Sequence, residues 1–210
     1  MIEILRQVVA AAYASLGETG VVLGTEGNVS VADRTSGIVL ITGTGLHARE
    51  ATEDGIAEVA LADGAHRSGP AASSELPSHL ALLRAGHGAV VHTHAPHATA
   101  VGLVRDEVPL VLAEQAVRAG GATPVVPYVT PGTDEMALSL EAALRGPVRA
   151  VVIRNHGLFS VGPDVVSALQ ATLATEEAAR IYLLARGIGE PALVPGHAVA
   201  TLRALGGISA

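Results

Sequence analysis

With 210 residues, of which 49% are apolar but only 2% aromatic, the chain is long enough for one α/β domain with a core of Ala, Val, Leu and Ile. A net charge of −7 without any basic run argues against nucleic acid as a partner, and no apolar run reaches the ~18 residues of a membrane span, so we expect a soluble, cytoplasmic protein. The absence of cysteine excludes thiolate ligands and disulfides, and the absence of lysine excludes catalysis through a Schiff base.

The first half of the chain predicts a helix followed by short strands. Apolar residues recur at helical spacing over residues 2–16, and Gly17 favours a helix end. A helix that carries residues 79–84 is expected further on, with Ser73 or Ser74 as its N-cap. Strands are expected over residues 21–23, 29–33, 38–41 and 58–62, the second and third forming a hairpin.

The second half predicts strands that alternate with helices. Strands are expected at 89–91, 124–129 (an edge, because of its prolines) and 148–153. Helices are expected over residues 96–104, after Thr133, and from about 164 to 186. Because no internal repeat or linker is visible, residues 1–210 are interpreted as one domain.

Two histidines follow a predicted buried strand. His92 and His94 continue the run 89–91, so strand alternation places both imidazoles on one face. Their Cα atoms would lie roughly 6.6 Å apart, close enough for both rings to bind one ion. A structural role is disfavoured, because two buried imidazoles would each need a polar partner.

A third nitrogen ligand is expected at the end of another strand. The β-branched run 148–153 leads to His156, and Gly157 is expected to allow a sharp turn just after it. Glu75 is a candidate fourth ligand, or a base that stands beside the metal. These ligand types suit Zn²⁺, and also Mn²⁺ or Co²⁺.

Two short loops rich in glycine and hydroxyl groups follow neighbouring strands, at residues 24–28 and 42–45. Such loops offer backbone N–H groups and hydroxyls to an anion such as phosphate, although glycine is also the ordinary turn residue. Ser73 and Ser74, at an expected helix start beside Glu75, add a third candidate. Neither loop has the Walker or the dinucleotide-binding spacing.

Five motifs occur in a characteristic order. They are Gly27-Asn28-Val29-Ser30, Thr42-Gly43-Thr44-Gly45, Ser73-Ser74-Glu75 with His79, His92-Thr93-His94 with Ala100, and Asn155-His156-Gly157. In this order and spacing, the chain resembles the class II aldolase/adducin family over roughly residues 2–186, and within it most closely the L-fuculose-1-phosphate aldolase branch.

The resemblance implies an α/β/α sandwich around a mainly antiparallel sheet, assembled as a homotetramer with active sites between subunits. It implies that His92, His94 and His156 bind Zn²⁺, with Glu75 as the resting fourth ligand and then the catalytic acid/base. It also implies a small sugar phosphate as substrate, with the phosphate bound by Gly27, Asn28, Thr44, Gly45, Ser73 and Ser74.

The implied reaction is the reversible cleavage of a ketose 1-phosphate to dihydroxyacetone phosphate and an aldehyde. A metal would stabilise, as a Lewis acid, the enediolate formed when the C3–C4 bond breaks. Sugar-phosphate 4-epimerase, dehydratase and decarboxylase activities of the same family stay open, although the epimerases carry aspartate where this chain has Glu75. A metal-free, adducin-like interaction module is disfavoured because all ligand positions are filled.

One segment departs from the fuculose-phosphate pattern. That branch has a tyrosine, contributed by the neighbouring subunit to protonate the aldehyde oxygen, in the segment that matches residues 108–121, and no tyrosine occurs there in this chain. Glu114 stands at about the matching position, and a glutamate in this region serves the methylthioribulose-phosphate dehydratases. Glu114 is therefore a candidate replacement for the proton donor, and the substrate is left open.

Overall fold

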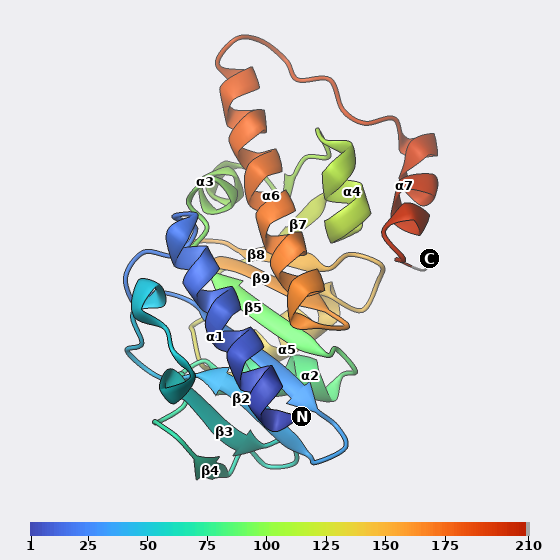
Figure 1. Cartoon of the computed structure of the whole chain (residues 1–210). Coiled ribbons are helices and arrows are strands. Elements are labelled where there is room, and N and C mark those ends of the chain that lie inside the picture. Colours follow the sequence, from blue (N-terminus) through green and yellow to red (C-terminus); the bar gives the residue numbers. More distant parts are fainter. Residues whose placement is uncertain (209–210) are drawn as a thin grey trace.

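A nine-stranded sheet forms the centre of the computed structural model, which describes residues 1–208 (Figure 1). Within these residues the strand order is β4-β3-β2-β1-β5-β9-β8-β7-β6, and all neighbours are antiparallel except β7 and β8. The strands are β1 (Asn28–Asp33), β2 (Ile38–Thr42), β3 (Ile56–Ala60), β4 (His66–Ser68), β5 (Ala89–Thr93), β6 (Glu107–Val108), β7 (Thr123–Val126), β8 (Ala150–Ile153) and β9 (Gly157–Gly162).

Helices cover both faces of this sheet. One core cluster packs a face against α1 (Ile2–Glu18), α3 (Pro96–Val104) and α6 (Val165–Arg186), and the second cluster packs the other face against α2 (Leu76–Arg84) and α5 (Asp134–Ala143). The fold is therefore the expected α/β/α sandwich. Among the described helices, none combines the length and the hydropathy that a membrane crossing requires. The remaining elements are α4 (Ala113–Ala119), α7 (Val199–Leu205) and 3₁₀ helices at Ala48–Glu50, Glu53–Gly55 and Gly196–Ala198.

The central strand β5 shows how alternation divides the two cores. Ala89 and Val91 belong to the cluster with α1 and α6, whereas Val90 belongs to the cluster with α2 and α5. His92 continues the second series, so its ring lies on the face that α2 covers. β5 is buried along its whole length between β1 and β9, which fixes the histidine backbone firmly.

Several predicted elements are confirmed. α3 spans the predicted residues 96–104, and α6 begins after Asp164 as expected. Thr133 caps α5, because its side chain accepts a hydrogen bond from the Met136 N–H. The hairpin of β1 and β2 is also present, with Ser30 opposite Ile41.

Other boundaries were wrong, and each error has a local cause. Residues 21–23 are not a strand, because the N–H groups of Val21 and Val22 bond to the Leu16 carbonyl at the end of α1. α1 itself continues through Gly17 to Glu18. The predicted strand at 58–62 is shifted to residues 56–60, since residues 61–63 turn toward β4.

The strand β9 was missed by the sequence interpretation. It begins and ends in glycine and follows β8 after only three residues, and the sequence predicts no element for it beyond a turn at Gly157. In the structure it pairs with both β5 and β8, with Phe159 opposite His92. This strand therefore brings the third histidine, which precedes it, to the end of β5.

A glycine governs the approach of the 24–28 loop to the end of β5. Gly27 has φ +78°, and a Cβ there would lie 2.5 Å from the His92 carbonyl oxygen. Gly24, three residues earlier, has φ +65° but faces open space. An L-residue would have a strained backbone at both positions, and only at Gly27 would its Cβ also collide with the backbone of a neighbouring strand.

Replacing these two glycines separates strain from collision. We expect Gly24→Ala to lower the free energy of unfolding by about 1 kcal/mol through its left-handed backbone alone. Gly27→Ala should cost at least ~2 kcal/mol more, because β1 must move away from β5. Urea unfolding of both variants measures the difference, and equal losses would show that the loop approach is not tightly fixed.

Candidate active site

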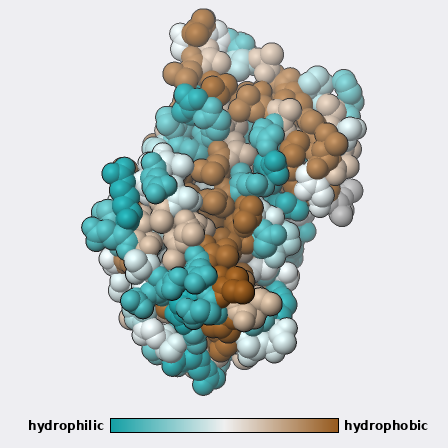
Figure 2. All heavy atoms as spheres, viewed as in Figure 1, coloured by the Kyte–Doolittle hydropathy of each residue, from teal (hydrophilic) through white to brown (hydrophobic). Residues whose placement is uncertain are grey.

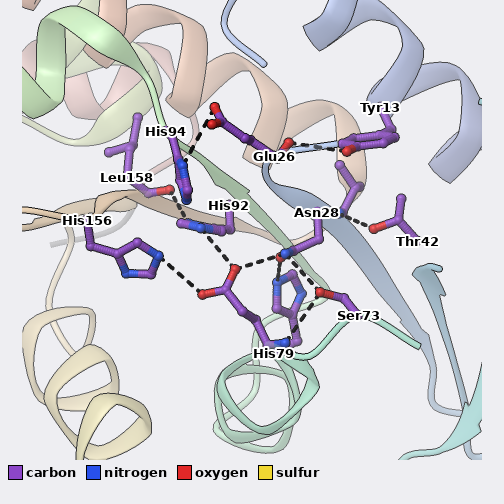
Figure 3. A network of polar contacts seen from close by, with 12 residues as sticks. Tyr13, Glu26, Asn28, Thr42, Ser73, His79, His92, His94, His156 and Leu158 are labelled. Atoms are coloured by element: carbon purple, nitrogen blue, oxygen red, sulfur yellow. Dashed lines mark hydrogen bonds and ion pairs between the residues drawn. The ribbon is translucent and has the colours of Figure 1, made fainter. Parts of the chain in front are cut away.

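Three histidines meet at one end of the central strands. His92 is the residue before the last one of β5, His94 lies just after that strand, and His156 lies in the turn between β8 and β9 (Figure 3). One ring nitrogen from each residue lies within 4.8 Å of those of the other two. The structure thus brings together the three residues that the sequence predicted as metal ligands.

His92 is the most deeply held of the three. Its ring is fully buried and stacks on Phe159 with 4.1 Å between ring centroids. Its Nδ1–H donates to the Leu158 carbonyl at 3.1 Å, because a carbonyl oxygen only accepts. Nε2 is therefore the nitrogen that faces the other two histidines and Glu75.

The turn that carries His156 is built differently from the prediction. Asn155, with φ +60°, takes the left-handed conformation, and among the described residues other than glycine it is alone in doing so. Gly157 does not supply the turn conformation. It is needed because a Cβ there would lie 2.4 Å from the Thr93 carbonyl oxygen, in the β5–β9 pairing.

Glu75 closes the group from the opposite side. Its carboxylate lies 3.0 Å from His92 Nε2 and 3.4 Å from His156 Nε2, and Asn28 Nδ2 donates to it at 2.9 Å. Burial alone would raise the pKa of Glu75, but the contacts with His92, Asn28 and His156 hold that pKa well below its usual range. The carboxylate is thus ionised at neutral pH.

The arrangement fits a bound cation. His92 uses Nδ1 for the bond to Leu158, so its other ring nitrogen, Nε2, is the one that lies 3.0 Å from a Glu75 carboxylate oxygen. Within residues 1–208, both His92 Nε2 and Glu75 Oε1 are buried without a hydrogen-bond partner. Buried polar atoms that converge without hydrogen-bond partners are what a metal ion would satisfy, and nitrogen and carboxylate oxygen are ordinary ligands of Zn²⁺.

The protonation of the histidines also suits metal binding. Burial and the neighbouring His92 lower the pKa of His156 to about 4. Burial and His92 also hold the pKa of His94 below its usual range. Both rings are neutral at pH 7, which is the state that donates a lone pair to a metal.

A pocket of about 340 Å³ opens beside the histidines. All six residues predicted to bind phosphate line it, together with Glu75, His94 and His156. They come from the 24–28 loop, the loop after β2 and the segment before α2, which are distant in sequence. The full lining is Thr25, Glu26, Gly27, Asn28, Gly43, Thr44, Gly45, Ser73, Ser74, Glu75, His94, Pro131 and His156.

The polar groups of this pocket are not all free. The Thr44 N–H donates to the Ala71 carbonyl at 2.9 Å, so the hydroxyl is the donor that Thr44 still has for a bound anion. Ser73 Oγ accepts from Asn28 Nδ2 at 3.0 Å and from the Glu75 N–H at 3.3 Å. A hydroxyl that already accepts twice keeps its own proton for a third partner, which leaves Ser73 a donor toward the pocket.

The helix start beside this pocket differs from the prediction. Neither Ser73 nor Ser74 is the N-cap of α2, because Glu75 takes that position and makes no side-chain capping bond. The Glu75 carboxylate instead turns toward the histidines. Its position at a helix N-terminus still favours a negative charge there.

Glu114 lies away from this pocket in the same chain. It stands in the first turn of α4, is exposed, and pairs with Arg118 at 2.7 Å. A shallow groove surrounds it, formed with Gln170, Leu173, Ala174 and Glu177. The structure therefore does not bring Glu114 to the histidines within one subunit.

Two residues near the site were missed by the sequence interpretation. Glu26 lies with its carboxylate 3.7 Å from His94 Nδ1, and its carbonyl accepts a hydrogen bond from the buried Tyr13 hydroxyl at 3.2 Å. Ser30 lies behind the site, two residues after Asn28 on β1. Strand alternation places Asn28 and Ser30 on one face, and this signal was available in the sequence.

His79 is fully buried beneath Asn28, and burial lowers its pKa to about 3. In the sequence, His79 follows Glu75 by about one helical turn. The structure shows that Asn28 stands between them, bonded to both side chains. The neutral ring therefore reaches Glu75 only through the amide.

The sequence and the fold match known proteins. The family model described as class II aldolase and adducin N-terminal domain matches residues 7–183. The chain belongs to the class II aldolase and adducin family. Class II aldolases are metal-dependent, and the His92, His94 and His156 group is a site of the kind that such enzymes need.

Named relatives of this family member are aldolases. A 5-deoxy-D-ribulose 1-phosphate aldolase from Bacillus thuringiensis is 32% identical over 194 residues, 90% of this chain and 89% of the relative. An L-fuculose phosphate aldolase from Escherichia coli is 35% identical over 170 residues, 80% of this chain and 77% of the relative. The chain is accordingly an enzyme of the lyase class.

Solved structures agree with the sequence relationship. A structure of L-fuculose 1-phosphate aldolase superposes with a TM-score of 0.88 at 30% identity, covering 95% of this chain and 94% of the other. A putative aldolase/epimerase/decarboxylase from Escherichia coli gives a TM-score of 0.86 at 27% identity, with 96% and 98% covered. The family fold thus extends over nearly the whole chain.

Removing one histidine tests the metal site directly. We expect His94→Ala to weaken zinc binding by more than about a hundredfold. Removing a residue that only hydrogen-bonds to a metal ligand already costs about 10- to 100-fold in affinity, and removing a ligand itself should cost more. The fold should persist, since His94 is partly exposed. Competition with a chromogenic chelator measures the affinity, with the exposed His66→Ala as the control. Equal affinities in the two variants would remove His94 from the ligand set.

Proposed function

We propose that the protein is a Zn²⁺-dependent aldolase that reversibly cleaves a small ketose 1-phosphate to dihydroxyacetone phosphate and an aldehyde. The observation that carries this proposal is the convergence of His92, His94, His156 and Glu75 at a pocket lined with hydroxyl groups. The aldolases for L-fuculose phosphate and 5-deoxy-D-ribulose 1-phosphate among the relatives support a substrate of this class.

The metal is proposed to be held by the three histidines, with Glu75 at the fourth position in the resting site. Zn²⁺ is the first candidate, and the same ligands suit Mn²⁺ and Co²⁺. When bound, such an ion would supply Lewis-acid stabilisation of the negative charge that develops on the substrate oxygens. The chain has no lysine, so it has no side-chain amine that could stabilise this charge by forming an iminium with the substrate.

Glu75 is the proposed acid/base. Its carboxylate is ionised and faces the pocket, so it is ready to take a proton from the substrate and to return it. Asn28 and the backbone of α2 hold this side chain, which keeps the proton acceptor in one place. In the cleavage direction a proton leaves the C4 hydroxyl as the C3–C4 bond breaks, and another is added to the enediolate carbon.

The substrate phosphate is proposed to bind where three segments meet, at Gly27, Asn28, Thr44, Gly45, Ser73 and Ser74. Ser73 Oγ accepts hydrogen bonds from Asn28 Nδ2 and from the Glu75 N–H, which leaves its own proton for a ligand, and Thr44 lines the same pocket. Gly45 has φ +72° and open space at its Cα, which leaves room for an anion beside the backbone. These donors support a dianion there without any lysine.

Assembly as a homotetramer with active sites at subunit interfaces is part of the proposal. Figure 2 shows apolar side chains gathered on the face that α6 crosses, and both Leu184 near the end of α6 and Ile188 just after the helix are exposed. Leu103 and Val104 at the end of α3 are exposed as well. An apolar surface of this kind suits contact with further copies of the chain.

A cytoplasmic location stays a prediction.

Glu114 is proposed to enter the active site of a neighbouring subunit as a proton donor. It is exposed on α4, and it stands at about the position of the tyrosine of the fuculose-phosphate branch. Because this chain has a glutamate where the fuculose-phosphate branch has a tyrosine, its reaction could differ as well. The second candidate function is therefore 4-epimerase, dehydratase or decarboxylase activity on a related sugar phosphate. The structural match to a putative aldolase/epimerase/decarboxylase supports this second candidate function.

A retro-aldol assay on a panel of ketose 1-phosphates tests the proposed function. Release of dihydroxyacetone phosphate is followed with a coupled dehydrogenase, with and without a chelator. Release that the chelator abolishes and added zinc restores is the expected result. If zinc is bound and no substrate yields dihydroxyacetone phosphate, the aldolase proposal fails, and product analysis decides among the other reactions.

Glu75→Gln separates metal binding from proton transfer. The variant keeps the shape of the side chain but removes its basicity, so we expect kcat to fall by at least ~10²-fold. The three histidines should still retain zinc, with reduced affinity. Kinetics and metal analysis of the same sample measure both quantities, and turnover near that of the parent would exclude Glu75 as the acid/base.

Glu114→Gln tests the contribution from a second subunit. We expect ~10-fold or greater loss of kcat with unchanged zinc affinity, because the residue is distant from the histidines of its own chain. Glu177→Gln is the matched control, since Glu177 lines the same groove and pairs with Arg180. Similar kcat values for the two variants would argue against a role of Glu114 in proton transfer.

A further inference from the structure

A buried chain of hydrogen bonds leads from the sheet to the carboxylate of Glu75. Ser30 Oγ lies 2.6 Å from His79 Nδ1, and His79 Nε2 lies 2.5 Å from Asn28 Oδ1. Asn28 Nδ2 in turn lies 2.9 Å from Glu75 Oε2. Figure 3 shows the His79 ring beneath Asn28, on the side away from the three histidines.

The direction of every bond in this chain follows from the Asn28 amide. Asn28 Nδ2 donates to two oxygens at once, Ser73 Oγ and Glu75 Oε2, so the NH₂ group of Asn28 faces Glu75. The Asn28 oxygen then faces His79 and needs a donor, which must be Nε2–H. A neutral ring with its proton on Nε2 accepts at Nδ1, and there the Ser30 hydroxyl donates.

Burial prevents water from replacing any of these partners. Ser30 and His79 are fully buried, and Asn28 is 4% exposed. If the Asn28 amide were rotated by half a turn, its oxygen would face the Glu75 carboxylate, and its NH₂ would face a nitrogen proton. Both contacts would be repulsive in a region of low dielectric, so the chain permits one orientation only.

The same orientation serves the pocket. The Asn28 NH₂ group donates its second proton to Ser73 Oγ at 3.0 Å. Ser73 is thereby held as an acceptor from Asn28, which leaves its own proton for the pocket. One amide therefore orients both the carboxylate beside the histidines and a hydroxyl at the proposed phosphate site.

We propose that Ser30 and His79 are positioning residues that act through Asn28: Ser30 locks His79 in the Nε2–H tautomer, and His79 thereby fixes the amide that holds Glu75. The consequence for catalysis rests on the proposed function, because Glu75 is the acid/base only there. The tautomer and its effect on metal affinity do not depend on the reaction that the site performs.

The variants distinguish a locked tautomer from simple packing. Ser30→Ala removes the donor to Nδ1 and leaves the ring in place. His79→Leu removes both ring nitrogens, whereas His79→Gln keeps an amide N–H close to the position of Nε2. Ser160→Ala is the matched control, because Ser160 is a fully buried strand serine whose Oγ has no hydrogen-bond partner within residues 1–208.

Two readouts do not need enzyme activity. Nitrogen-15 spectra of the full-length protein labelled at histidine identify which nitrogen of His79 carries the proton. Chelator competition gives the zinc affinity of each variant. We expect the Nε2–H tautomer in the parent and a mixture of tautomers in Ser30→Ala, with zinc affinity lowered ~10-fold in Ser30→Ala, as for partners of metal ligands in general.

Kinetics supply the third readout. We expect kcat to fall ~10-fold in Ser30→Ala and further in His79→Leu. His79→Gln should recover most of the kcat that His79→Leu loses, and Ser160→Ala should keep the kcat of the parent. An Nδ1–H tautomer in the parent, or a Ser30→Ala variant that matches Ser160→Ala in zinc affinity and kcat, would overturn the proposal. If the parent shows no aldolase activity, the proposed function fails, and the tautomer and zinc affinity still decide the positioning role.

Discussion

The buried carboxylate of Glu75 is the constraint on which the site depends. Its residue is 8% exposed, and its oxygens lie among two imidazoles and an amide. Taking an unpaired carboxylate out of water is so costly that the surroundings must compensate it. The fold does so with the helix N-terminus at Glu75, with the Asn28 NH₂ group, and with the histidine cluster that a cation would complete.

The register of three antiparallel strands places these groups. Asn28 of β1 and Phe159 of β9 stand on either side of His92 in β5. Because strand residues alternate between faces, this register directs Asn28, Ser30 and His92 to the side covered by α2, where His79 lies. A slip of one residue in the pairing of β1 with β5 would turn both Asn28 and Ser30 toward the opposite core.

Small residues permit the close approaches at this end of the sheet. Gly27 lets β1 begin against the His92 carbonyl, and Gly157 lets β9 begin against the Thr93 carbonyl. With only 2% aromatic residues, the chain fills its core with Ala, Val, Leu and Ile, and Phe159, its one phenylalanine, stacks on His92. The bulky ring therefore supports His92, the one of the three converging imidazoles that is fully buried.

The sequence by itself determined the local elements and the identity of the candidate ligands. Alternation paired His92 with His94, Thr133 predicted the start of α5, and the five motifs indicated the family fold before any distance was known. The sequence could not determine that β9 is a strand, that residues 21–23 are not one, or that Asn155 rather than Gly157 makes the turn at His156. Those outcomes, and the hydrogen bonds from Ser30 to Glu75, depend on which strands become neighbours and in what register, because contacts between residues about 50 positions apart leave no local pattern.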